Sequence, residues 1–127
     1  MSTSFIEYRG FGFWSNDSFT ELLIGETASA IVAQTDPAPW LGELAAHWTL
    51  QASGPFRAWM HLELDDFLNS EERRIKLRDI VQDVADKHPK SDPIHQTGIL
   101  LLRLLDGQII WDASSPLDYM VGNAAQP

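Results

Sequence analysis

The residues of this chain best suited to chemistry are its carboxylates and its four histidines, because cysteine is absent. Without cysteine, disulfides, thiolate metal sites and a cysteine nucleophile are excluded. The histidines fall at positions 47, 61, 88 and 95, with no HExxH motif and no i, i+4 spacing between any two of them. Glu43 and His47 stand four residues apart and would share one face of a helix. We interpret them as a hydrogen-bonded structural pair and expect neither a metal nor a cofactor.

Adjacent acids at Asp65 and Asp66 are the nearest approach to a paired-carboxylate hydrolase site. Such a mechanism needs two acids whose environments drive their pKa values apart. Neighbours in an extended segment point to opposite faces, so we predict a turn or a helix cap at this position instead. Ser114 and Ser115 lack the glycines of a GxSxG nucleophile elbow.

The Gly10-Phe11-Gly12 segment does not have the pattern of a phosphate-binding loop. The second glycine is followed by Phe13-Trp14, where such a loop requires Gly-Lys-Ser/Thr. Bulky rings there would obstruct the close approach of a phosphate to the backbone. We therefore predict a protein that is not an enzyme, and we leave open a site assembled from residues distant in sequence.

Aromatic side chains are concentrated at the start of the chain, around Gly10 and Gly12. They are Phe5, Tyr8, Phe11, Phe13 and Trp14. Glycine beside bulky rings indicates a sharp bend in which the rings either fill the core or form a binding surface. Trp14 and Trp59 lie next to polar sequence, on the opposite parity from their apolar neighbours, and we predict them as anchors for a protein partner. Burial is the alternative, because large aromatic side chains are usually buried.

The formal net charge is −9, and the few cations are unevenly distributed. Six of the nine Lys and Arg residues lie between positions 70 and 90, whereas residues 1–69 hold nine acids and two bases. An acidic field repels nucleic acid and anionic lipid and attracts basic proteins. We therefore expect no nucleic-acid or membrane partner. The alternative is that the acidity serves only solubility.

Hydrophobic periodicity and capping residues predict four main helices. A capping box at Ser18-Phe19-Thr20-Glu21 would start the first helix, Asp36-Pro37 the second, Asn69 or Ser70 the third and Asp92-Pro93 the fourth. The corresponding ranges are about 19–33, 38–50, 70–88 and 93–105, with a short turn expected at Leu117–Val121.

Alternation of apolar and polar residues over Phe56–Leu64 has the period of a half-buried strand. The segment 108–111 after Asp106-Gly107 is the other β-like stretch. The two could pair as a small two-stranded β element, or each could be an extended connection. We predict a single domain over residues 1–127 with a mainly α fold. It would be a compact bundle of about four or five helices, with an aromatic N-terminal segment (1–17) and a frayed tail (122–127).

Residues 1–20 lack the basic start and apolar run of a secretion signal, and no apolar stretch reaches the length of a membrane span. We expect a cytoplasmic location, with export by an unrecognised route left open. The oligomeric state is not predicted.

Three features together resemble the small immunity proteins of bacterial polymorphic-toxin and contact-dependent inhibition systems. They are the segment Tyr8-Arg9-Gly10-Phe11-Gly12-Phe13-Trp14, the helix from Trp40 to Trp48, and the link Asp65-Asp66-Phe67-Leu68 into Glu71-Glu72-Arg73. The resemblance spans most of the chain in layout. It implies a protein that binds one cognate toxin domain, often a basic nuclease, and blocks its active site or an adjacent surface.

An acidic inhibitor of a basic toxin gains electrostatically steered association, and aromatic anchors would slow dissociation. The contacts predicted for such a partner are Trp14, Asp17, Glu21, Trp59, Glu63, Asp65 and Asp66. Two other functions stay open: a secretion chaperone, which would generally act as a dimer, and a small-molecule-binding domain or unrecognised enzyme, which would need a concave apolar pocket.

Overall fold

A computed structural model describes residues 3–53 and 61–108 of the chain. In this part the chain forms a β-hairpin followed by five helices. Their bounds are β1 Thr3–Tyr8, β2 Phe11–Asn16, α1 Asp17–Val32, α2 Pro39–Ser53, α3 Leu64–Phe67, α4 Glu71–Asp86 and α5 Pro93–Leu105. The prediction of a mainly α fold with a small two-stranded β element is confirmed.

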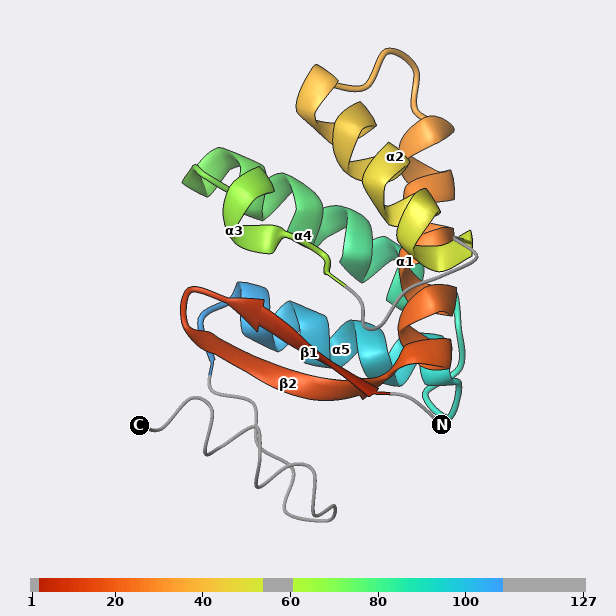
Figure 1. Ribbon diagram of the computed structural model, residues 1–127. Helices are drawn as coiled ribbons and strands as arrows, with labels where there is room; N and C mark the ends of the chain where they lie inside the picture. The colour runs from red at the N-terminus through yellow and green to blue at the C-terminus, as the bar shows by residue number, and fades with distance from the viewer. Residues whose placement is uncertain (1–2, 54–60, 109–127) are drawn as a thin grey trace.

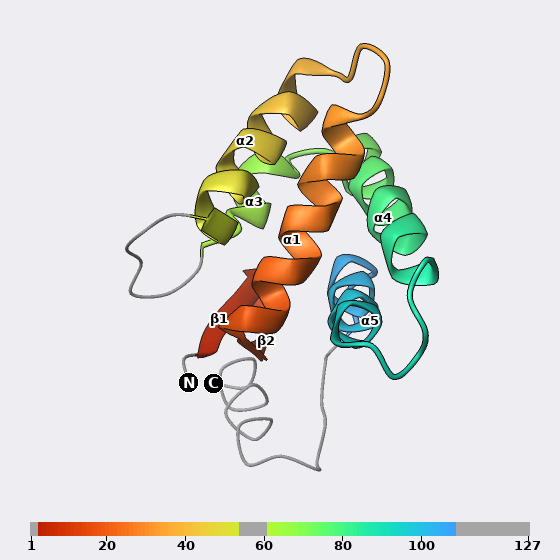
Figure 2. The ribbon, with the colours of Figure 1, turned by 90° about the vertical axis from the view of Figure 1, so that its right-hand side faces the viewer.

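Helix α1 is the central element of the structure (Figure 2). It packs against α2 on one side and against α4 and α5 on the other, and α4 and α5 also pack together. The hairpin contacts α1 and α5, while α3 lies next to β1 (Figure 1). Each of the four predicted helices is present, with ends within three residues of the predicted ones.

The aromatic N-terminal segment is the antiparallel hairpin. Its strands pair from Thr3 opposite Asn16 to Tyr8 opposite Phe11, so only Arg9 and Gly10 form the turn. Both turn residues have positive φ, 53° for Arg9 and 84° for Gly10. This is the backbone of a type I′ turn, whose twist matches that of the flanking strands and in which glycine is favoured.

The two faces of the hairpin differ in burial. Ile6, Tyr8 and Phe13 point into the core, and the opposite face carries Phe5 and Trp14, which are half-buried. This alternation is the period-two pattern of a strand pair with one face on the core. Core filling and surface exposure were the two alternatives for the aromatic segment. Both occur, because one set of rings fills the core and the other forms part of the surface.

Side-chain caps explain three of the helix starts. Ser70 and Asp92 cap α4 and α5 as predicted, with Pro93 in the first turn of α5. For α1 the capping-box prediction is wrong. Asn16, two residues before Ser18, is the N-cap, and its side chain accepts hydrogen bonds from the main-chain N–H groups of Ser18 and Phe19. Strand β2 thus passes directly into α1 with no loop between them.

The strand predicted over residues 56–64 is not formed in its described part. Residues 61–63 are irregular and α3 begins at Leu64, although the burial of Leu62 and Leu64 alternates with exposed neighbours as predicted. The main-chain carbonyls of His61 and Leu62 bond to the side chains of His47 and Trp48 of α2. The carbonyls therefore do not join a β-ladder. Gln108 is also outside any strand, and residues 56–60, 109–111 and 117–121 lie outside the described residues.

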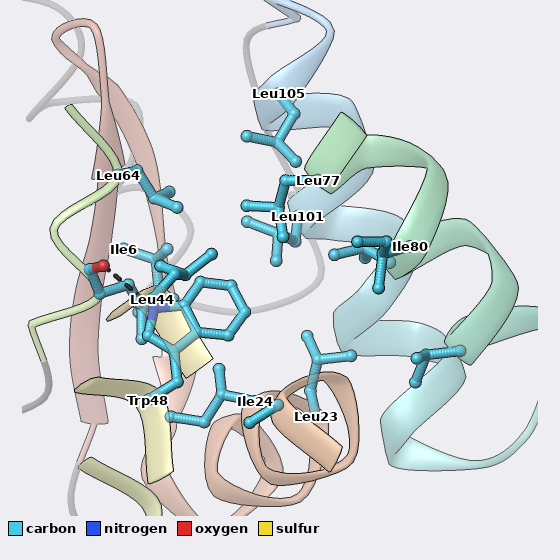
Figure 3. Close-up of a cluster of buried hydrophobic side chains, with 14 of the residues drawn as sticks. Ile6, Leu23, Ile24, Leu44, Trp48, Leu64, Leu77, Ile80, Leu101 and Leu105 are labelled. Atoms are coloured by element: carbon cyan, nitrogen blue, oxygen red, sulfur yellow. Dashed lines mark hydrogen bonds between the residues drawn. The ribbon is translucent and has the colours of Figure 1, made fainter. Parts of the chain in front are cut away.

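Trp48 is the largest fully buried side chain among the described residues (Figure 3). Its indole N–H donates to the carbonyl oxygen of Leu62 at 3.1 Å, drawn as the dashed line in Figure 3. Leucine and isoleucine side chains from β1, α1, α4 and α5 complete the cluster. Trp48 thus ties the irregular segment before α3 to the helices.

Candidate partner-binding site

A groove lies between β1 and the segment that leads into α3. Its volume is about 320 Å³, and it is lined by Phe5, Ile6 and Glu7 on one side and residues 61–66 on the other. Strand β2 pairs with one edge of β1, and the segment of residues 61–66 lies on the other side of β1 (Figure 1).

Four carboxylates line this groove. Glu63, Asp65 and Asp66, three of the predicted partner contacts, are brought together with Glu7 of β1. Among the described lining residues there is no Lys or Arg. Like charges that line one groove repel one another without a counter-charge, so these residues favour a cationic occupant. Glu7 was missed in the sequence analysis, although its place on the exposed parity of an alternating segment could have identified it.

The wall carrying Glu63 is held by side chains from α2. His47 Nε2 lies 2.7 Å from the carbonyl oxygen of His61 and 3.7 Å from Glu63 Oε2. Gln51 accepts a hydrogen bond from the main-chain N–H of His61 at 3.0 Å. Glu63 itself has a left-handed backbone, with φ of 55°. This network fixes a segment that has no secondary structure of its own.

The two adjacent acids have different roles. Asp65 Oδ1 accepts a hydrogen bond of 2.9 Å from the main-chain N–H of Arg9, in the hairpin turn. Asp65 therefore closes one end of the groove. Asp66 is exposed at its rim, in the first turn of α3. The pair lies within the single turn of α3, so the predicted turn is present, whereas the N-caps of α3 and α4 are Glu63 and Ser70 and not these acids.

Trp14 lies on the outer face of the hairpin, one strand away from the groove. Its ring packs against Phe5, with ring centroids 5.3 Å apart, and Phe5 in turn lines the groove. The ring is half-buried, and its indole Nε1 is buried with no hydrogen-bond partner among the described residues. Trp14 supports the groove through Phe5, and its role as a partner anchor stays a prediction.

Two further predicted contacts, Asp17 and Glu21, do not line the groove. Asp17 is 8% exposed, and its carboxylate accepts a hydrogen bond from Ser4 Oγ at 2.6 Å. This bond joins β1 to the start of α1, so Asp17 has a structural role and offers little surface to a partner. Glu21 is half-buried on α1. Trp59 lies outside the described residues.

The basic residues of α4 are largely engaged within the chain. Arg74 pairs with Glu71 and donates to the carbonyl oxygen of Leu105, and Arg78 donates to Asp106 at 2.7 Å. The Arg73 guanidinium stacks over Trp40, 5.1 Å from its ring centre. These contacts link α4 to the end of α5 and to α2. The arginines therefore do not neutralise the carboxylates of the groove.

Within residues 3–53 and 61–108, no three His, Asp or Glu side chains are arranged to hold a metal ion. His47, half of the Glu43–His47 pair, points instead to His61 and Glu63. The partner predicted for His47 is therefore wrong, while its structural role agrees with the prediction.

A second cavity of about 560 Å³ lies between the α1–α2 loop and α4. Its described lining carries three acids, Asp36, Glu72 and Asp79, and one base, Lys76. Lys76 therefore offsets part of the negative charge of this cavity, whereas no Lys or Arg is among the described residues that line the groove at β1.

None of the helices in the described part of the chain combines the length and hydrophobicity needed to cross a bilayer. Comparison with protein-family models, with curated proteins and with solved structures found no match to this chain.

Proposed function

We propose that this chain is a non-enzymatic, acidic protein-binding domain, and that it acts as an immunity protein or antitoxin that binds and inhibits a basic toxin domain. The observation that carries the proposal is the gathering of Glu7, Glu63, Asp65 and Asp66 around one groove whose described lining residues include no Lys or Arg. Three of these carboxylates come from one short segment and the fourth from a strand 56 or more residues away in sequence.

Electrostatics connects this arrangement to an inhibitor. Four carboxylates along one groove speed the encounter with a basic surface and orient it before contact. A partner that binds in this way should dissociate as salt is raised, because salt screens charges beyond about 8 Å at physiological ionic strength. A toxin that acts on nucleic acid would present such a basic surface.

The test is capture of the tagged chain from lysate of its own host at low ionic strength, followed by release with increasing salt. The decisive variant carries Glu63→Lys and Asp66→Lys, two exposed positions on the groove. Its matched control carries Glu43→Lys and Asp83→Lys, which are exposed, lie outside the groove and change the net charge equally.

We expect the wild type and the control to capture one basic protein, and the groove variant to lose at least 90% of it. The captured protein should be toxic when expressed alone and harmless when expressed with the wild-type chain. Equal capture by both double variants would contradict the proposal, as would recovery of no basic protein.

A small-molecule-binding function is the second candidate, favoured by the cavity of about 560 Å³ beside α4. Its volume lies within the range of ligand pockets, roughly 300–1,000 Å³. Its charges of mixed sign make it less selective than such sites usually are. A secretion chaperone would be supported by a stable dimer in light scattering together with binding of an unfolded client.

A further inference from the structure

Strand β1 has one edge that no other strand covers in the described part of the chain. The sheet consists of β1 and β2 alone, and β2 occupies one edge of β1. The groove runs along the other edge. An uncovered edge carries a row of main-chain donors and acceptors that can pair with an added strand.

The register identifies which groups of β1 are available. In a hairpin with a two-residue turn, the residues that flank the turn exchange main-chain hydrogen bonds, and this pairing repeats at every second residue. Tyr8, Ile6 and Ser4 therefore bond to β2. The N–H and C=O groups of Phe5 and Glu7 must point the other way, into the groove.

A hydrogen bond at the end of the strand supports this direction. Arg9 has the same parity as Phe5 and Glu7, and its N–H reaches Asp65 across the groove. Among the described residues, no further hydrogen bond joins the main-chain groups of Phe5 or Glu7 on this side. Two consecutive outward-facing positions of the edge are thus open.

The charge of the groove indicates what would cover this edge. Carboxylates stand on both sides of it, from Glu7 on the strand and from Glu63, Asp65 and Asp66 on the opposite wall. Side chains of a strand point alternately to its two faces, so a segment with Lys or Arg at alternate positions could pair through its backbone and direct a row of cations to these acids.

We infer that the groove accepts an extended, basic segment of a partner protein as a third strand on β1. The main chain of Phe5 and Glu7 would supply the hydrogen bonds, and the four carboxylates would select for basic side chains. Strand addition of this kind gives affinity through the backbone and specificity through alternate side chains. The inference rests on the proposed function, because it specifies how a basic partner is held.

The probe for the experiment is a fluorescent, end-capped peptide that alternates Lys and Val, measured by anisotropy titration against the full chain. Two derivatives carry N-methyl groups, one on every Lys nitrogen and the other on every Val nitrogen. Only one of these two sets of N–H groups can face β1 in a paired strand. We expect one derivative to bind at least tenfold more weakly than the other.

The matching change in the protein is Glu7→Pro, with Glu7→Thr as its control. Proline removes the outward N–H and is tolerated on an edge strand where that N–H faces away from the ladder. Threonine removes the charge alone and suits a strand. We expect Glu7→Pro to bind the peptide at least tenfold more weakly than Glu7→Thr, while circular dichroism of the two variants stays the same.

Amide hydrogen exchange gives a readout that does not depend on the variants. In the free wild-type chain, the N–H of Glu7 should exchange faster than that of Ile6, and addition of the peptide should slow exchange at Phe5 and Glu7. Protection of Glu7 in the free chain would overturn the inference. If that protection grew with protein concentration, the occupant would be a second copy of the chain.

Equal binding by the two N-methylated peptides would also overturn it, because it would mean that only charge holds the peptide. This result is distinguishable from failure of the proposed function. If only the strand addition fails, the charge-dependent capture of a basic protein from the host would still be seen. The partner would then lie on the acidic surface without pairing to β1. Loss of the capture with the N-methyl difference intact would instead contradict the toxin inhibitor and support the strand-accepting edge.

Discussion

Asp65 and Arg9 are 56 residues apart in sequence and are joined by a hydrogen bond of 2.9 Å from the Arg9 main-chain N–H to Asp65 Oδ1. The bond connects the tip of the β-hairpin to the first turn of α3. Arg9, the donor of this bond, has a left-handed backbone. That conformation costs a residue with a side chain roughly 1–2 kcal/mol. The Arg9 guanidinium lies over the Tyr8 ring at 4.9 Å, a contact that adds to the same turn.

Asp65→Ala should therefore destabilise the fold and change the groove together. We expect a loss of about 1 kcal/mol in the free energy of unfolding, the usual contribution of one hydrogen bond, and a smaller loss for Asp65→Asn, which keeps an acceptor oxygen. Urea unfolding measures both, and exchange of the Arg9 amide should speed up in the alanine variant only. Equal effects would mean that charge, and not hydrogen bonding, stabilises the turn. Because a change at Asp65 affects stability and the groove together, charge reversal at Asp66 is the cleaner test of binding.

Tyr8→Phe should stabilise the protein. The Tyr8 side chain is 2% exposed, and its hydroxyl is buried with no hydrogen-bond partner in the described part of the chain. An unsatisfied buried polar group costs about 1–3 kcal/mol, so its removal should raise the free energy of unfolding by about 1 kcal/mol. A lower value for the phenylalanine variant in urea unfolding would contradict this prediction.

The same residue predicts how stability falls at alkaline pH. Burial raises the pKa of Tyr8 above its ordinary value of 10.0, an effect that nearby Arg9 and Arg74 partly offset. A raised folded-state pKa means that the stabilisation is complete below about pH 10 and is lost as the pH rises through the folded value. Wild type should therefore lose more stability than Tyr8→Phe between about pH 9 and about pH 11. Equal losses of stability in wild type and Tyr8→Phe would mean that groups other than Tyr8 cause the fall in stability at alkaline pH.

Gly12→Ala should destabilise the hairpin. A Cβ at this position would come within 2.7 Å of the Phe5 ring and would also meet the carbonyl oxygen of Ile6. Overpacking of this kind costs about 1–3 kcal/mol. Gly42→Ala is the control, because α2 is open to solvent there and alanine favours a helix over glycine by about 1 kcal/mol. The midpoint temperature of thermal unfolding should fall for Gly12→Ala and rise for Gly42→Ala. A neutral Gly12→Ala would mean that both the Phe5 ring and the main chain at Ile6 can move aside.

The Ser4–Asp17 pair should show energetic coupling in a double-mutant cycle. The carboxylate accepts a buried, charge-assisted hydrogen bond and also lies in the first turn of α1, where negative charge is favourable. Asp17→Ala should cost about 2 kcal/mol, and Ser4→Ala should cost less in the absence of Asp17 than in its presence. Partner binding should be unchanged in Ser4→Ala. Additive losses in the free energy of unfolding would contradict the coupling. Loss of partner binding in Ser4→Ala would instead indicate that Asp17 is among the partner contacts.

The helices could be predicted from sequence because their signals are local. Ser70 and Asp92 are caps followed by periodic apolar residues, and the structure starts α4 and α5 directly after them. Such signals need no knowledge of the rest of the fold. The start of α1 was misplaced because Asn16 and Ser18 are both good caps, and the pairing of Asn16 with Thr3 in the hairpin decided between them.

The groove could be predicted only in part. The segment of Glu63, Asp65 and Asp66 was identified by its acidity, but nothing local links it to Glu7, and the hairpin brings them together. The hairpin itself was missed because Arg9 stands where Asn or Asp would mark a type I′ turn. The strand at 56–64 was predicted from a correct alternation of buried residues, but the carbonyls of His61 and Leu62 bond to side chains of α2, which a pattern of hydrophobicity cannot reveal.

The carboxylates beside β1 also bear on the colloidal behaviour of the protein. An open strand edge is a template for polymerisation, and natural proteins protect such edges with charged side chains. Two copies joined at β1 would confine the acids of both grooves in one narrow space, where their repulsion opposes the joining. This protection depends on the charge of the edge. Substitutions that replace these acids with neutral residues should therefore favour the growth of fibres.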